Sequence, residues 1–150
     1  MLTGTIKSGK TKLAHTVLPG MLSAAYANKA RWRSTRRRPV IFTYSFPLDM
    51  NAEAAAMDLQ RALAAFGRKI NVPFDLDPTP ADAFATLDTA LLEFASRIQA
   101  GGGELWLLWD ELQAPVLAST PAMAQHFIYK FKAVSERSSA EVNCIVTTRR

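Results

Sequence analysis

The sequence has little cysteine and histidine and no long hydrophobic run. Its 150 residues include one cysteine, Cys144, and two histidines. A single cysteine excludes a framework of disulfide bonds, and so few sulfur and imidazole ligands exclude a structural zinc cluster. No apolar run approaches the roughly 18 residues that a membrane-spanning helix needs. The first residues carry lysines without an apolar segment, which excludes a secretory signal. We therefore expect an intracellular, cytoplasmic protein without a membrane span.

The composition is that of a folded domain. Hydrophobic residues make up 49% of the chain and charged residues 21%, which supports a packed core and excludes disorder for the chain as a whole. The length fits one domain of ordinary size. We predict a single domain over residues 1–150.

The positive charge is concentrated in one segment. The net charge is +5, and the ten residues 29–38 contain six basic residues and no acid. Removing these six charges leaves −1 for the rest of the chain. We predict that Arg31–Arg38 is exposed to solvent. The segment is either a solvated connector or a patch that attracts nucleic acid, an anionic membrane or an acidic partner, and Trp32 within it offers a ring for base stacking.

Helical and strand-like patterns alternate along the chain. Apolar spacing predicts helices over residues 10–28, 52–70, 80–98 and 121–134, and apolar runs predict strands over residues 40–46, 105–109 and 142–147. We expect a kink or two short helices at Pro19-Gly20, and a loop over residues 71–80. Thr79-Pro80 and Thr120-Pro121 are typical of helix starts. This alternation indicates an α/β fold with a mostly parallel sheet covered by helices on both sides.

A phosphate-binding motif lies near the N-terminus. Gly4-Thr5-Ile6-Lys7-Ser8-Gly9-Lys10-Thr11 satisfies G-x-x-x-x-G-K-[ST]. The glycines let the backbone N–H groups wrap around phosphate oxygens, and the following helix points its positive end at the same anion. Lys10 is expected on the β- and γ-phosphates, and the Thr11 hydroxyl on Mg²⁺. The alternative is a glycine-bearing turn with a solvated Lys10.

The strand that should precede this loop is short. Only Met1, Leu2 and Thr3 come before Gly4, which we expect to be too few for a central strand. We interpret the chain as a fragment without its first strand, and the abrupt end after Arg150 agrees with this. The alternative is that another segment supplies the strand.

An acidic pair closes the most hydrophobic strand. Asp110 and Glu111 follow the apolar run Leu105–Trp109. Because parallel strands end at the ligand edge of an open α/β sheet, both carboxylates should emerge beside the phosphate loop. Asp110 is then expected to hold Mg²⁺, mainly through its water shell, and Glu111 to act as general base toward the attacking water. The alternative is an acidic loop after a core strand.

The chain ends in threonines and arginines. Thr147-Thr148-Arg149-Arg150 follows the last predicted strand. A polar or basic side chain at this strand end can reach the γ-phosphate or its water. The alternative is a frayed, solvated tail.

In this order the three elements resemble the AAA+ and STAND families of P-loop ATPases. The Walker A motif is Gly4–Thr11, the Walker B motif is Leu105–Glu111, and Val142–Arg149 occupies the sensor strand. Residues 145–149 are similar to the hhxTTR sensor of NB-ARC-type ATPases, and residues 110–113 to the DE-x-Q stretch of prokaryotic-type ATPases.

The resemblance implies a three-layer P-loop NTPase sandwich with strand order 5-1-4-3-2, in which the first and last strands are truncated here. It also implies ATP and Mg²⁺ as ligands, and it places Arg149 opposite the γ-phosphate. The family's fifth strand, its helical lid and a second arginine that acts as a finger have no counterpart in this sequence.

Three functions follow from these observations. The first is the ATP-binding and hydrolysing core of a larger AAA+/STAND-type ATPase, with its own oligomer or the rest of a larger chain as partner. The second is a nucleotide-binding switch or scaffold with little turnover. The third is a DNA-handling ATPase whose segment 29–38 contacts phosphates. A small-molecule kinase is disfavoured because Glu111 is typical of water activation.

Overall fold

The computed structural model describes residues 2–4, 12–30, 37–75, 82–137 and 142–149. Strands and helices alternate, as predicted for an α/β fold. The strands are β1 (Leu2–Gly4), β2 (Arg38–Ser45), β3 (Gly103–Asp110) and β4 (Val142–Arg149). The helices are η1 (Leu13–Val17), α2 (Leu18–Ala30), α3 (Ala52–Lys69), α4 (Ala83–Ala100), α5 (Gln113–Leu117) and α6 (Pro121–Arg137).

Strands β2, β3 and β4 form a three-stranded, all-parallel sheet with β3 at its centre. The short β1 adds in parallel to the other side of β4, which gives the order β1-β4-β3-β2. The first strand is therefore present but short, because Leu2–Gly4 forms the three-residue β1 opposite residues 147–149. The prediction that it is missing is wrong, whereas its truncation stays a prediction. All three residues of β1 pair with the last three residues of β4.

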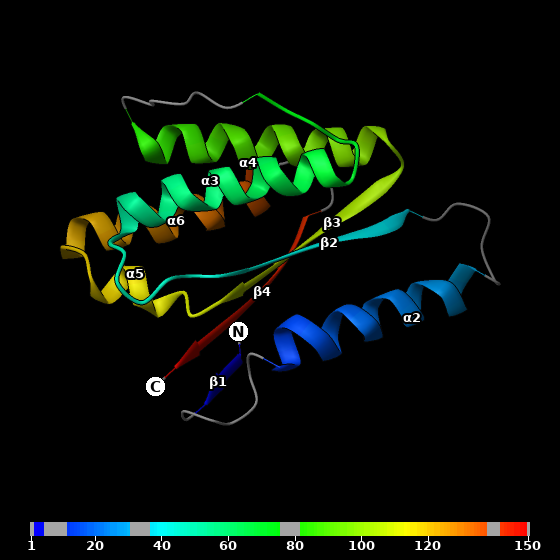
Figure 1. Ribbon diagram of the computed structural model, residues 1–150, viewed down its shortest axis with the longest axis horizontal. Coiled ribbons are helices and arrows are strands. Elements are labelled where there is room, and N and C mark those ends of the chain that lie inside the picture. Colours follow the sequence, from blue (N-terminus) through cyan, green and yellow to red (C-terminus); the bar gives the residue numbers. More distant parts are fainter. Residues whose placement is uncertain (1, 5–11, 31–36, 76–81, 138–141, 150) are drawn as a thin grey trace.

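Helices cover both faces of the sheet, as predicted. In Figure 1, α3, α4 and α6 lie on one face and α2 lies on the other. The main core fills the space between the sheet and the first group of helices. Its fully buried members include Leu59, Leu63, Leu87, Leu91, Phe94 and Trp109. These are the apolar positions that the helical and strand patterns place on inward faces.

Alternation along β3 separates the core from the candidate site. Leu105, Leu107 and Trp109 belong to the main core. Because successive strand residues point to opposite faces, Asp110 lies on the face of η1 and α2, and it contacts His15 of η1. The same face carries Glu104, whose carboxylate accepts hydrogen bonds from Tyr26 of α2 and from Asn143 of β4. Polar contacts thus join the segment η1–α2 to β3 near both ends of that strand, at Asp110 and at Glu104.

The N-terminal helix is irregular but unbroken. The structure has a π-helical turn, η1, followed directly by α2, so the predicted irregularity lies just before Pro19, as two joined helical elements without a gap between them. In η1, the Leu18 N–H donates to the Leu13 carbonyl. Proline has no N–H and crowds the carbonyl four residues earlier, here that of His15. A wider turn just before Pro19 accommodates the ring without ending the helix.

Proline is also tolerated inside β2. The predicted strand over residues 40–46 is found as β2, which begins earlier, at Arg38, includes Pro39 and ends at Ser45. The Arg38 N–H donates to the Gly102 carbonyl at 3.1 Å, so alternation turns the Pro39 nitrogen toward the outer edge. Because β2 is an edge strand, the missing N–H costs no hydrogen bond of the ladder.

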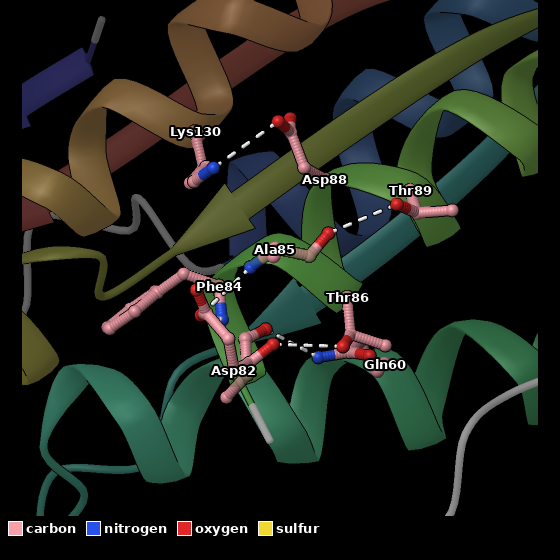
Figure 2. Close-up of polar contacts among 9 residues, drawn as sticks. Gln60, Asp82, Phe84, Ala85, Thr86, Asp88, Thr89 and Lys130 are labelled. Atoms are coloured by element: carbon pink, nitrogen blue, oxygen red, sulfur yellow. Dashed lines mark hydrogen bonds and ion pairs between the residues drawn. The ribbon is translucent and has the colours of Figure 1, made fainter. Parts of the chain in front are cut away.

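The start of α4 differs from its prediction. The helix begins at Ala83, and Asp82 is its N-cap: the carboxylate accepts from Phe84 N at 2.9 Å and Ala85 N at 3.0 Å (Figure 2). The Ala85 bond contributes most to a lowered pKa of Asp82. Asp82 takes the capping role predicted for Thr79, which lies outside the described residues. Its carboxylate accepts two N–H bonds, whereas a threonine hydroxyl is a weaker cap.

Helices α3, α4 and α6 are tied together by polar side chains. Gln60 of α3 is buried, and its amide donates to the carbonyl of Ala83 at 3.0 Å. Lys130 of α6 pairs with Asp88 of α4 at 3.3 Å (Figure 2). The predicted start of α6 at Pro121 is confirmed.

Two details of the C-terminal half were not predicted. Helix α5 has only five residues, which is too short to show a helical period. Ile128, which the pattern places on the buried face of α6, is 46% exposed.

Candidate functional site

The ends of three parallel strands meet at one edge of the sheet. Asp110, the last residue of β3, lies opposite Ser45 of β2. On its other side it contacts Thr147 of β4, and Thr147 in turn lies opposite Leu2 of β1. Strand β4 therefore separates Asp110 from the end of β1, where Gly4 lies opposite Arg149. This is the edge at which open α/β sheets bind their ligands.

Asp110 is buried, and one of its carboxylate oxygens accepts no hydrogen bond among the described residues. The residue is 1% exposed. Oδ1 accepts hydrogen bonds from the Thr147 hydroxyl and from Glu111 N, the latter at 3.1 Å. Oδ2 has no hydrogen-bond partner among the described residues and lies 3.7 Å from His15 Nε2. A buried carboxylate oxygen without a hydrogen bond is costly, so it indicates a place for a cation or donor.

His15 belongs to the candidate site through its contact with Asp110, and the sequence patterns did not reveal it. Its side chain comes from the π turn η1 and approaches Asp110 across the sheet face. Single π turns are frequent at functional sites because they re-aim side chains of a helix. Only its spacing could have indicated this role. His15 follows Thr11 by four residues, and residues four apart lie on the same side of an α-helix.

Glu111 has a strained backbone. Its φ is +59°, in the left-handed region that non-glycine residues rarely adopt. Its residue is 6% exposed, and the Gln113 amide Nε2 donates to its Oε2 at 2.5 Å. Backbone strain of this kind costs about 1–3 kcal/mol and persists where surrounding contacts hold it, often at functional sites. The turn fixes Glu111 directly beside Asp110 at the sheet edge.

The sensor-like segment forms the end of β4. Thr147 is fully buried, and its hydroxyl donates a hydrogen bond to Asp110 Oδ1. This bond connects β4 to the acidic pair at the end of β3. The backbone of Arg149 lies opposite Gly4. The prediction that the Arg149 side chain senses the γ-phosphate stays a prediction, and Arg150 lies outside the described residues.

The phosphate loop lies largely outside the described residues. Gly4 is the last residue of β1, and Lys12 begins the described helical segment. Between them are Thr5, Ile6, Lys7, Ser8, Gly9, Lys10 and Thr11, whose predicted roles stay predictions. What the structure supplies is a strand before this segment and a helix after it, which is the context that a phosphate loop requires.

The basic segment is described only at its borders. Arg38 is exposed, as predicted, whereas Arg37 is half-buried. Residues 31–36 lie outside the described residues, so the exposure predicted for the rest of Arg31–Arg38 stays a prediction.

The described part of the chain carries neither a metal-ligand cluster nor a membrane-spanning helix. Among these residues there is no group of three or more His, Cys, Asp or Glu side chains that could hold a metal ion by itself. None of the described helices is long and apolar enough to cross a membrane. No family model matches the chain, and no curated protein matches it either.

Proposed function

We propose that the chain binds ATP at the carboxyl edge of its sheet and hydrolyses it with Mg²⁺, as the nucleotide-binding core of a larger AAA+/STAND-type ATPase. The observation that carries this proposal is that Asp110 and Glu111 lie buried at the edge where β1 ends in Gly4. Gly4 opens the phosphate-loop motif Gly4–Thr11. The order β1-β4-β3-β2 agrees with the shared part of the family's order 5-1-4-3-2, which further supports a P-loop NTPase sandwich.

Asp110 fits the requirements of a magnesium ligand. Its Oδ2 is buried and lacks a hydrogen bond within the described segments, and Mg²⁺ prefers carboxylate and other oxygen ligands. The Thr11 hydroxyl is the second proposed ligand. When bound there, Mg²⁺ would neutralise negative charge on the phosphates. Thr147 and the Glu111 N–H keep Asp110 in place by occupying its other oxygen.

The remaining residues are assigned by their position at this edge. Lys10 and the loop N–H groups hold the phosphates, and Glu111 accepts a proton from the attacking water as general base. The hydrogen bond from Gln113 fixes the orientation of the Glu111 carboxylate. Arg149 at the end of β4 meets the γ-phosphate, since its backbone lies beside the start of the loop.

The direct test is an ATP titration combined with a phosphate-release assay, each with Mg²⁺ or with EDTA. Saturable binding and Mg²⁺-dependent release are expected. Binding without release would favour the switch or scaffold function instead, and stimulation of release by DNA would favour the DNA-handling one. A chain that neither binds nor hydrolyses ATP contradicts the proposal.

Replacing Arg149 by alanine should reduce the preference for ATP over ADP. The expected loss is about 5- to 30-fold in ATP affinity, the usual effect of one lost charge-assisted contact of roughly 1–2 kcal/mol, with ADP binding nearly unchanged. Competitive titrations with both nucleotides measure it. Arg61→Ala, at an exposed position of α3, is the matched control. An equal loss for both nucleotides would mean that Arg149 attracts charge in general.

Nucleic-acid binding, where it occurs, should depend on the basic segment. We expect the triple substitution of Arg36, Arg37 and Arg38 by alanine to weaken DNA binding and to flatten its dependence on salt, because fewer counterions are released. Fluorescence anisotropy at several salt concentrations measures both effects. The control removes three exposed basic residues of α3, which are Arg61, Arg68 and Lys69. Equal losses in the two triple variants would remove segment 29–38 from the DNA-handling hypothesis.

A further inference from the structure

A pocket of about 500 Å³ lies at the amino ends of β2 and β3, at the opposite edge of the sheet from Asp110. Arg38 and Gly103, the first residues of these strands, contribute to its lining, together with the last turns of α3 and α4. These ends lie together on the side of the molecule away from α5 in Figure 1. Pockets for small molecules usually have volumes of about 300–1,000 Å³.

The walls of the pocket are apolar. Phe66 comes from the last turn of α3, Ile70 and Val72 from the cap and loop after it, and Val40 from β2. These four side chains are only half-buried, although they pack against the main core. An apolar ligand group in the pocket would remove them further from water, which favours binding in proportion to the area covered.

Two arginines line the pocket, and one of them, Arg97, is already ion-paired with Glu93 at 2.7 Å. Arg97 of α4 donates from Nε and Nη2 to Glu93 Oε1 and from Nη1 to the Pro73 carbonyl, at 2.6–3.0 Å. These bonds hold the guanidinium in one orientation and use three of its five N–H groups, so two N–H groups remain for a ligand. Arg38 is exposed, and no acidic side chain is among the described residues that line the pocket.

We infer that this pocket binds a small amphipathic carboxylate, whose apolar body contacts Phe66 and Val40 and whose carboxylate lies between Arg38 and Arg97. An extended peptide added to the edge of β2 is a poorer fit, because Pro39 has no N–H to offer at this part of the edge. The site is separate from the proposed nucleotide site, so either can fail without the other.

The first test is a titration of the ¹⁵N-labelled chain with 1-naphthoate, followed by amide shifts in ¹H–¹⁵N spectra. Saturating shifts are expected at Val40, Gly101 and Gly103, which line the pocket. The uncharged 1-naphthalenemethanol should bind at least about threefold more weakly, because it lacks the ion pair. Absent or unsaturable shifts at these amides, or equal affinity for the alcohol, would overturn the inference.

A blocking variant locates the site. Gly101 has a φ of −78°, and a Cβ there would meet no atom closer than 3.5 Å. Gly101→Leu should therefore fold, and its side chain should occupy the rim and abolish saturable naphthoate binding. Gly20→Leu, where a Cβ meets nothing within 4 Å, is the control on α2. Unchanged binding by the folded Gly101→Leu chain, as judged by its spectrum, would overturn the inference.

A charge variant tests the role of Arg38. Arg38→Gln should weaken naphthoate binding about threefold to fivefold, the effect of one partly exposed ion pair, and should leave binding of the alcohol unchanged. Arg61→Gln, on the exposed side of α3, should change neither. Equal naphthoate affinity of Arg38→Gln and the parent chain would contradict the assigned role of the arginine.

Discussion

Replacing Lys10 by alanine should abolish ATP binding and hydrolysis together, whereas replacing Glu111 by glutamine should abolish hydrolysis alone. Lys10 is proposed to meet the phosphates before reaction, so its loss removes ground-state binding. Glu111 is proposed to act on the attacking water, so its contribution is realised mainly in the transition state. Glutamine keeps the shape of the side chain but removes its basic oxygen, which should slow turnover by about 10²-fold or more. A nucleotide titration and a phosphate-release assay on each variant measure the two effects.

Matched controls separate these effects from general loss of charge. Lys69→Ala and Glu136→Gln change exposed residues of α3 and α6 and should behave as the parent chain. Hydrolysis by Glu111→Gln at the parent rate would contradict the assignment of Glu111 as general base. ATP binding by Lys10→Ala with parent affinity would contradict the phosphate loop, whatever the rate of hydrolysis.

Local periodicity made much of the fold predictable. Leu59 and Leu63 are one helical turn apart and are fully buried in α3, as their spacing indicated. The continuous apolar run of β3 predicted a central strand, and β3 does pair on both sides. These patterns are visible in sequence because each depends on neighbours within one element.

Features that depend on distant contacts were harder to predict. Three residues before Gly4 carry no strand pattern, and β1 forms because β4 offers a parallel edge beside it. Pro39 is tolerated because β2 is an edge strand of the described sheet, and the local sequence does not indicate which strand lies at an edge. The start of α4 was misplaced because Thr79-Pro80 has the local pattern of a helix start, whereas the observed cap is Asp82, which accepts two N–H bonds there.

The candidate site was predicted in part for the same reasons. The order of motifs and the end of a hydrophobic strand correctly placed Asp110 and Glu111 at the carboxyl edge of the sheet. The partners of Asp110 are remote in sequence: Thr147 comes from the next strand in space, and His15 from a helix irregularity. The left-handed backbone of Glu111 had no signal either, since no glycine or asparagine marks that position.

Replacing Trp109 by alanine should cost about 3–5 kcal/mol of the free energy of unfolding, the usual result for a large buried aromatic residue. Trp109 is fully buried, and its ring contacts those of Phe42, Phe46 and Phe131 at centroid distances of 5.3–6.0 Å. These rings come from β2, the segment after it, and α6, so the indole joins the sheet to the helical layer. Since a domain is typically stable by only about 5–15 kcal/mol, the variant should be close to unfolding.

Urea denaturation followed by circular dichroism measures this loss, and two further variants keep the test informative. Trp109→Phe retains part of the buried area and should fall between the parent and the alanine variant. Trp106→Ala removes a half-buried indole on the opposite face of β3, so it should cost clearly less than Trp109→Ala. Because Asp110 follows Trp109 directly, the site should lose its geometry when this core loosens, and ATP binding by Trp109→Phe should weaken in step with its stability. If Trp109→Ala unfolds at the parent urea concentration, or no more readily than Trp106→Ala, the main core does not extend to the end of β3 as described.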